Sequence, residues 1–364
     1  MEDERHNIEV ALVDKELMHI VFGFLRFTDL ASISAVCRAS EVTRVLIRGR
    51  VLSIGTVGHA GLGYCLLDPA PMRWRMISAL ASETIVHIAT TPEKYDRHHT
   101  LAVTRSGAVY AFGDATDGKL GLGEGHTTGI SYTPQIVSAL LSEKIIKTIG
   151  SNDSVKPFIV DLWCGRAVTL LLDSEGTLYS FGVASSLGRE SADSRSGRPL
   201  PLQFPAGVKI KSAAMGYNHG LAITTQGEVY SWGSGVHGRL GHGDEQDANA
   251  PRLISALASA KATQVACGPE HSLVLTEDNT LYTFGRVVKG QLGYVEGAVE
   301  SVPWVVEDVA GLGVISAISA AAGQSAVLFE SGRVMGLGCG ELKKENWLVP
   351  AQLVAGEDSV FLVC

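Results

Sequence analysis

Residues 229–251 read VYSWGSGVHGRLGHGDEQDANAP and crowd five glycines into the eleven positions from 233 to 243. A glycine-rich stretch that occurs once can cradle a phosphate, whereas one that recurs along a chain serves the scaffold. This stretch recurs, because an aromatic-Gly segment followed by Leu-Gly is found again elsewhere. The close copies are Tyr110 to Gly113 with Leu120-Gly121, Tyr230 to Gly233 with Leu240-Gly241, and Tyr282 to Gly285 with Leu292-Gly293.

Three looser copies bring the number of repeats to six. Their first glycines are Gly55, Gly182 and Gly338, and successive copies along the chain lie 51 to 69 residues apart. A period near fifty residues, built from short β-rich segments between turn signals, is typical of a β-propeller. The glycines of residues 233–243 are therefore predicted to turn one blade of a repeat scaffold.

Each copy contains a hairpin signal. Residues 271–285, HSLVLTEDNTLYTFG, read as an apolar strand, a two-residue turn and a second apolar strand. Asp278-Asn279, Gln226-Gly227 and Ser106-Gly107 are the expected turns, in which the second residue favours positive φ. The near-continuous apolar runs predict sheets that are buried on both faces, as when blades pack on blades. Prolines after each copy, such as Pro134, Pro251 and Pro303, are expected where the chain leaves one sheet for the next.

These residues resemble the regulator of chromosome condensation repeat, whose pattern is Gly-x-x-His-(Ser/Thr)-Leu-x-Leu, a turn, Tyr-x-Trp-Gly and Gly-x-Leu-Gly. Gly216 to His219 and Gly268 to His271 match it, while Val168 and Ala326 are taken to stand at the His position. The family folds as a β-propeller, usually with seven blades. The fold class expected here is mainly β: a six-bladed propeller, with seven blades as the alternative, and a small N-terminal α-helical unit.

The two ends of the repeat region indicate how the propeller closes. Residues 358–364, DSVFLVC, resemble the opening strands VDLWCG (160–165) and TQVACG (263–268), whereas residues 43–55 resemble a repeat that lacks such a strand. The C-terminal residues are therefore predicted to complete the first blade, which leaves no open sheet edge.

Residues 11–40, ALVDKELMHIVFGFLRFTDLASISAVCRAS, do not fit the repeat. Leu17, Ile20, Val21, Phe24 and Leu25 follow helical spacing, so a compact helical unit is predicted here. The expected domains are this unit at residues 1–42 and the propeller at residues 43–364. A unit of about forty residues buries too little core to stand alone, so it should dock on the propeller or on a partner.

The helical residues resemble an F-box. Asp29-Leu30 and Val36-Cys37-Arg38 stand at family spacing after an apolar helix, although Val13 replaces the usual Pro and Ser40 the frequent Trp. The resemblance implies contact with a Skp-type adaptor and, through it, with a cullin ubiquitin ligase. The implied contact residues are Leu12, Val13, Leu17, Ile20, Val21, Phe24, Leu25, Leu30, Val36 and Cys37. A plain helical cap over the propeller is the alternative.

Composition narrows the possible classes of function and location. The formal net charge is −8 without a Lys/Arg cluster, so no nucleic-acid partner is expected. No basic leader precedes an apolar run and no membrane span is expected, which predicts an intracellular protein in cytoplasm or nucleus. The six cysteines form no Cys-x-x-Cys pair, and His219 and His271 occupy equivalent repeat positions, so neither a metal nor a cofactor nor an enzyme activity is expected.

The resemblances together predict a substrate receptor of a Skp, cullin and F-box ubiquitin ligase, with a protein substrate on one rim of the propeller. Arg189, Arg195 and Arg198 are candidates for receiving an acidic or phosphorylated peptide there, and a solvated loop is the alternative. The competing functions are guanine-nucleotide exchange on a small GTPase, which is the activity of the repeat family's founding member, and a plain non-catalytic scaffold.

Overall fold

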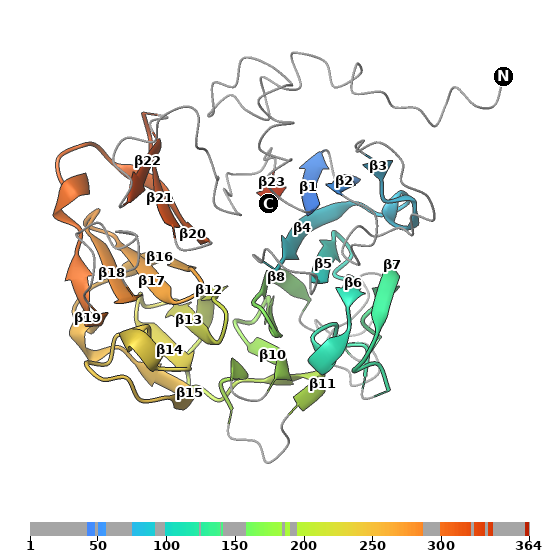
Figure 1. The fold of residues 1–364 in the computed structure, drawn as a ribbon, viewed down its shortest axis with the longest axis horizontal. Helices are drawn as coiled ribbons and strands as arrows, with labels where there is room; N and C mark the ends of the chain where they lie inside the picture. The colour runs from blue at the N-terminus through green and yellow to red at the C-terminus, as the bar shows by residue number, and fades with distance from the viewer. Residues whose placement is uncertain are drawn as a thin grey trace.

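The computed structural model shows six antiparallel β-sheets arranged around a common centre (Figure 1). The helices with described bounds are short 3-10 helices. The structure describes residues 42–47, 50–55, 75–91, 99–123, 125–138, 140, 158–183, 186–189, 195–286, 299–321, 324–331, 334–337 and 361–363.

The first three sheets follow one another along the chain, apart from one strand that comes from the C-terminal end. From the innermost strand outward, the first sheet is β23 (Phe361–Val363), β1 (Val42–Ile47), β2 (Arg50–Gly55) and β3 (Arg75–Met76). The second is β4 (Ile85–Thr90), β5 (His99–Thr104), β6 (Val109–Asp114) and β7 (Ile130–Ile136). The third is β8 (Ile159–Cys164), β9 (Val168–Asp173), β10 (Leu178–Val183) and β11 (Arg195–Pro201).

The other three sheets repeat the same order. The fourth is β12 (Ile210–Met215), β13 (His219–Thr224), β14 (Val229–Gly233) and β15 (Ala248–Leu253). The fifth is β16 (Ala262–Cys267), β17 (His271–Thr276), β18 (Leu281–Arg286) and β19 (Val299–Val305). The sixth is β20 (Ile315–Ala321), β21 (Gln324–Phe329) and β22 (Val334–Leu337). Each sequence copy thus supplies one blade, and the described residues supply no seventh sheet.

Short 3-10 helices connect some of these strands. They are η3 (Ser78–Leu80), η4 (Thr116–Gly118), η6 (Val236–Gly238), η7 (Ser255–Leu257) and η8 (Glu307–Val309). None of the helices in the part of the chain that the structure describes is long and apolar enough to cross a membrane.

The predicted hairpin turns are confirmed. Gly107, Gly227 and Asn279 have φ values of 81°, 84° and 65°, and each stands at the second position of its two-residue turn. Asn279 is one of the few side chains that tolerate this left-handed region, and its amide also bonds the next blade: Nδ2 donates to the Gly313 carbonyl at 3.0 Å, and Oδ1 accepts the Ile315 N–H at 2.7 Å. The turn therefore fixes both the hairpin and the adjoining blade.

The prolines lie within the outermost strands and not between the sheets. Pro134 lies in β7, Pro251 in β15 and Pro303 in β19, and the pairing of each of these strands with its neighbour shifts register where the proline stands. A residue without an N–H is tolerated where a bulge and a sheet edge make its donor unnecessary. The repeated bulge explains the repeated proline.

The core lies between the blades, as the apolar runs predict. Strands β5, β9, β13 and β17 are buried at every position. The large apolar clusters mix residues of neighbouring sheets: Leu101 of the second blade packs in one cluster with Leu171 of the third. Similarly, Leu273 of the fifth blade shares a cluster with Val327 of the sixth. Apolar burial between neighbouring sheets therefore holds the second to sixth blades together.

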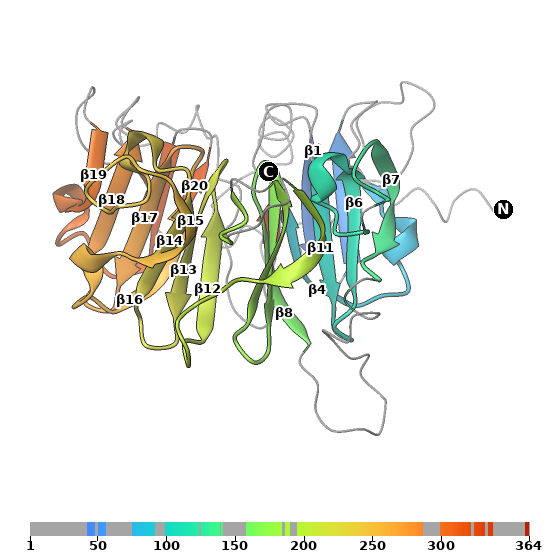
Figure 2. The same ribbon diagram turned by 90° about the horizontal axis from the view of Figure 1, so that it is seen from below.

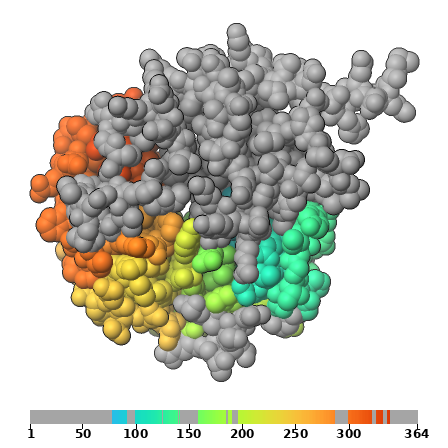
Figure 3. All heavy atoms as spheres, in the orientation of Figure 1, coloured from blue at the N-terminus to red at the C-terminus, as the bar shows by residue number. Residues whose placement is uncertain are grey.

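The first blade is completed by the C-terminal end of the chain, which confirms the predicted closure. Arg44, Val45 and Leu46 of β1 pair in antiparallel register with Val363, Leu362 and Phe361 of β23. Viewed from the side, the strands of the described blades run along the short dimension of a disc (Figure 2). The second to fifth blades follow one another around this disc (Figure 3).

The predicted F-box residues, from Leu12 to Cys37, lie outside the described residues. The described chain begins at Val42 with β1, which is already part of the first sheet. The boundary between a helical unit at residues 1–42 and a propeller at residues 43–364 therefore stays a prediction.

Candidate functional site

The Gly-x-Leu-Gly motif is used in contacts between blades. A Cβ at Gly188, in the third blade, would lie 2.6 Å from Cδ1 of Trp232 in the fourth. A Cβ at Gly241 would lie 2.9 Å from Cε2 of Phe284 in the fifth. Both glycines also have positive φ, at 70° and 74°. The aromatic residue of one repeat therefore requires the glycine of the preceding repeat. This contact explains why the aromatic-Gly segment and the Leu-Gly pair recur together.

The motif histidines join neighbouring blades. Nε2 of His219 lies 3.0 Å from Oγ of Ser272, and the Ser272 hydroxyl donates to the Arg239 carbonyl at 2.8 Å. Because the hydroxyl has one proton and gives it to the carbonyl, it accepts the Nε2–H of His219. Burial, reinforced by the charge of Arg239, lowers the pKa of His219 well below its ordinary value. The ring is thus a neutral structural donor.

The same bond recurs at two other described blade boundaries. His99 Nε2 lies 2.8 Å from Oγ1 of Thr169, and His271 Nε2 lies 2.7 Å from Oγ of Ser325. The last contact corrects the sequence alignment of the sixth repeat. Ser325 pairs with Leu337 and takes the Ser position, so Gln324, and not Ala326, stands where the other repeats have His.

Buried charges beside these bonds are also structural. Lys119 Nζ lies 2.7 Å from Asp114 Oδ2, and their side chains are only 1% and 7% exposed. Burial alone would raise the pKa of Asp114, but the hydrogen bonds from Lys119 and Thr116 outweigh it and hold that pKa below its ordinary value. Lys119 also accepts the Thr169 hydroxyl on its carbonyl at 2.8 Å, so the ion pair supports a blade boundary.

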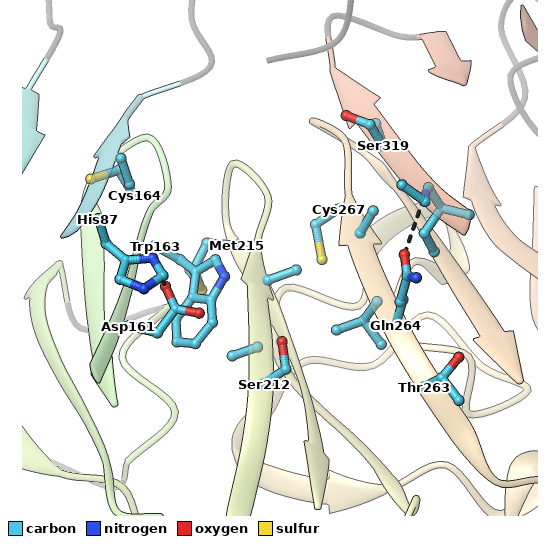
Figure 4. Close-up of a pocket in the computed structure, with 18 of the residues that line it drawn as sticks. His87, Asp161, Trp163, Cys164, Ser212, Met215, Thr263, Gln264, Cys267 and Ser319 are labelled. Atoms are coloured by element: carbon cyan, nitrogen blue, oxygen red, sulfur yellow. Dashed lines mark hydrogen bonds and ion pairs between the residues drawn. The ribbon is translucent and has the colours of Figure 1, made fainter. Parts of the chain in front are cut away.

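The inner strands enclose a cavity of about 330 Å³ at the centre of the disc (Figure 4). Every inner strand from β4 to β20 has a bulge after its first residue, and the residue after the bulge lines the cavity. Because a bulge changes the direction in which side chains point, five equivalent positions face the cavity at one level. This ring, called here the bulge ring, consists of His87, Asp161, Ser212, Gln264 and Ala317.

Asp161 is the one carboxylate among the described residues that line this cavity. Its Oδ1 accepts the Leu162 N–H at 2.8 Å and lies 3.5 Å from Nδ1 of His87. Burial raises the pKa of Asp161, and the nearby His87 opposes that shift. The side chain nevertheless remains 32% exposed, so the carboxylate is both desolvated and accessible.

A second ring of equivalent positions lies two residues further along each inner strand. Four of its members are small, and the fifth is Trp163 of β8, whose indole lines the cavity near Asp161 (Figure 4). The small members are Ala89, Ala214, Ala266 and Ser319. Strand β8 therefore contributes both an indole and a carboxylate to the lining of the cavity.

The bulge ring was not predicted from the sequence, although VDLWCG (160–165) and TQVACG (263–268) are equivalent opening strands. Those two segments align Asp161 with Gln264, so a lone acid at an otherwise uncharged strand position was the available signal. Cys164 and Cys267 lie at equivalent places, and both are buried cysteines that form no disulfide. Burial raises the pKa of the Cys267 thiol, so this cysteine is an inert part of the core.

The structure describes the side chains of two of the three predicted arginines, Arg189 and Arg198, and they lie in different surroundings. Arg189 turns back to its own blade, where Nη2 lies 3.5 Å from the Ser180 carbonyl, and burial lowers its pKa. Arg198 of β11 is exposed, and its backbone N–H and carbonyl bond the Ser196 hydroxyl. The Arg195 side chain lies outside the described residues. A peptide site at these arginines stays a prediction.

Exposed apolar side chains gather on the outer strand of the fifth blade. Val302, Trp304 and Val305 of β19 are 46%, 54% and 40% exposed. The helix η6 of the fourth blade packs against β19, since a Cβ at Gly238 would lie 2.5 Å from Cα of Ser301. Exposed Val236 of η6 therefore lies near the same strand. Val236, Val299, Val302, Trp304 and Val305 are called here the β19 patch.

This arrangement of blades defines the protein as a β-propeller of short glycine-rich repeats, and comparison with known proteins supplies the family. The family model of the RCC1-like domain matches residues 25–358. The chain therefore belongs to the RCC1-like domain family. The match begins within the segment that the sequence predicts to be an F-box.

Curated relatives share the domain but extend well beyond it. The chain is 32% identical to human E3 ubiquitin-protein ligase HERC2 over 66% of its length, which is 5% of that protein. It is 31% identical to Protein RCC2 homolog of Danio rerio over 70% of its length, which is 52% of that protein. The chain thus spans about half of the second relative and a small part of the first.

Solved structures share the fold. Yeast RCC1 (Prp20), solved bound to Kap60, superposes with a TM-score of 0.66 at 22% identity, covering 91% of this chain and 74% of that one. Human WBSCR16 superposes with a TM-score of 0.64 at 22% identity, covering 81% of this chain and 74% of that one. Both likenesses describe the propeller itself.

Proposed function

We propose that this chain is a non-catalytic propeller that binds a protein partner. The observation that carries the proposal is the β19 patch, where Trp304 and its valine neighbours are exposed on an outer strand. Exposed apolar patches of this kind mark interaction sites, and tryptophan is enriched among residues that dominate protein interfaces. The motif residues, by contrast, are engaged in holding the blades together.

The descriptions of related proteins also favour binding of protein partners. Relatives that share the domain carry different descriptions, namely a ubiquitin ligase and an ultraviolet-B receptor. A domain common to such different proteins is best explained as a scaffold for partners, and Prp20 is described through its binding to Gsp1p and histones.

Two finer roles would use this scaffold. Guanine-nucleotide exchange on a small GTPase needs the propeller alone and no catalytic side chain, so it is the second candidate. The ubiquitin-ligase adaptor role depends on residues 11–40, which lie outside the described residues. The propeller would hold a protein in either role, and the finer roles differ in which protein binds and where.

The test is a direct binding assay of the purified full chain against a Skp-type adaptor and a panel of small GTPases. Trp304→Ser with Val302→Ser removes the apolar core of the β19 patch, and each partner held there should lose at least about tenfold in affinity. Ile136→Ser with Tyr132→Ser on the second blade is the matched control, because both side chains are also exposed. Equal binding by the β19 variant and the wild type to every partner would contradict the proposal.

A second variant separates the finer roles. Leu25→Ala with Leu30→Ala alters the predicted F-box segment and changes no residue of the described strands. Loss of adaptor binding in this variant alone would support the ligase role. Accelerated nucleotide release from one GTPase, abolished by the β19 variant and retained by the Leu25 and Leu30 variant, would support exchange.

A further inference from the structure

The bulge ring presents a single open negative group to the central cavity. Oδ1 of Asp161 is engaged by the Leu162 N–H and faces His87, whereas Oδ2 has no hydrogen-bond partner among the described residues. The described lining contains neither lysine nor arginine to neutralise it. A desolvated carboxylate with one unused oxygen is a strong acceptor for a cationic donor.

A second unused acceptor lies on the neighbouring inner strand. Ser212 of β12 lines the same cavity, and its hydroxyl makes no hydrogen bond within the described part of the chain. Gln264 of β16 differs, because both ends of its amide are engaged: Nε2 donates to the Ser316 carbonyl at 2.8 Å, and Oε1 accepts the Ile318 N–H at 3.2 Å. The open polar groups of the bulge ring are thus concentrated on β8 and β12 (Figure 4).

Trp163 adds an apolar and aromatic surface beside these acceptors. The equivalent positions on the other inner strands carry three alanines and one serine, so no other bulky side chain enters the channel at that level. An indole next to a carboxylate attracts cations through its ring and also covers a methylene chain. A volume of about 330 Å³ is at the lower end of the range for ligand sites in proteins, about 300–1,000 Å³.

We infer that the central cavity binds a lysine side chain, and, on the proposed function, one that belongs to the protein partner. The ammonium lies at Asp161 Oδ2 and the Ser212 hydroxyl, and the methylene stem lies along Trp163 and the small residues. Lysine fits better than arginine, because the guanidinium fork needs both oxygens of a carboxylate and Oδ1 is already engaged. An ammonium needs only a single oxygen.

The test measures binding of Nα-acetyl-lysine N-methylamide to the full chain by ligand-observed NMR. A probe of this size should bind with a Kd of about 1 mM. The neutral isostere Nα-acetyl-norleucine N-methylamide should bind at least about tenfold more weakly, and the arginine analogue should also bind more weakly than the lysine probe. No binding of the lysine probe by the wild type, or equal binding of the norleucine probe, would overturn the inference.

Variants locate the site. Asp161→Asn keeps the shape of the side chain, and the lysine probe should lose at least about tenfold in affinity. Asp308→Asn, on the exposed helix η8, makes the same change in net charge and should bind as the wild type does. Wild-type affinity in Asp161→Asn would overturn the inference. Because the probe needs no protein partner, this failure is distinct from the loss of binding that the β19 variants test.

Discussion

The Ser272 hydroxyl joins two blades through two hydrogen bonds: it accepts the Nε2–H of His219 at 3.0 Å and donates to the Arg239 carbonyl at 2.8 Å. His219, Arg239 and Ser272 are all buried, at 0%, 4% and 0% exposure. A buried group that loses its partner cannot turn to water instead. One serine therefore satisfies two buried groups of the preceding blade.

Ser272→Ala should lower the free energy of unfolding by about 1–3 kcal/mol, because it leaves the His219 N–H and the Arg239 carbonyl unsatisfied. The measurement is equilibrium unfolding in urea, with the slope compared as well as the midpoint. Ser255→Ala on the exposed helix η7 is the matched control and should change stability by less than about 0.5 kcal/mol. A Ser272 variant as stable as this control would contradict the assigned role.

His219 makes stability depend on pH in a defined direction. Its pKa in the folded protein lies well below the ordinary value of 6.5, so below pH 6.5 the unfolded chain binds a proton that the folded chain refuses. Above pH 6.5 this histidine should therefore cost no stability. As the pH falls below 6.5, the free energy of unfolding should fall by about 1.4 kcal/mol per pH unit because of this histidine, until the pH reaches its pKa in the folded protein. Burial likewise lowers the pKa of His242, to about 4, and this adds a loss of the same sign.

His219→Gln tests whether His219 causes the loss of stability in acid. Glutamine is a suitable replacement, because Gln324 occupies the equivalent place in the sixth blade. The variant should have a shallower decline of unfolding free energy between pH 6 and pH 5 than the wild type, measured by denaturation at each pH. His126→Gln, at an exposed position, is the control and should keep the wild-type slope. An unchanged slope in His219→Gln would show that acid destabilisation arises elsewhere.

Alanine variants of Gly188 and Gly207 distinguish the stability cost of a steric contact from the cost of backbone strain. Both have positive φ, at 70° and 83°, but a Cβ at Gly188 would meet Trp232 whereas one at Gly207 would have nothing within 4 Å. Gly207→Ala should cost about 1–2 kcal/mol from strain alone. Gly188→Ala should cost about 1–3 kcal/mol more, because the indole has to move. Equal costs for the two variants in urea denaturation would show that the blade boundary yields freely.

The scaffold was predictable from the sequence because its rules are local and repeated. A two-residue turn needs a residue such as Asn279 that tolerates positive φ, and a hairpin follows from the apolar runs on either side of it. The closing pair of β1 and β23 was also predictable, since residues 358–364 repeat an opening strand that residues 43–55 lack. The turn signals are local, whereas the closure signal comes from comparing both ends of the chain with the repeat.

The channel was not predictable in the same way, because its members come from five blades and meet only when the ring is formed. The bulge that turns Asp161 and Ser212 toward one cavity is a feature of strand pairing that the residue pattern does not show. The surroundings of Arg189 were not predictable either, because the contact of its guanidinium with the Ser180 carbonyl depends on how the loop after β10 folds back on its own blade.

The buried ion pair of Lys119 and Asp114 lies beside the boundary between the second and third blades, so its loss should lower the free energy of unfolding. Lys119→Met leaves the Asp114 carboxylate buried without its 2.7 Å partner and should cost about 3–5 kcal/mol of unfolding free energy. Adding Asp114→Asn removes the stranded charge, so the double variant should be more stable than Lys119→Met alone. Lys211→Met, at an exposed position, is the control and should change stability little. If the double variant were the less stable one, Asp114 would contribute to the blade independently of Lys119, through its hydrogen bonds with Thr116.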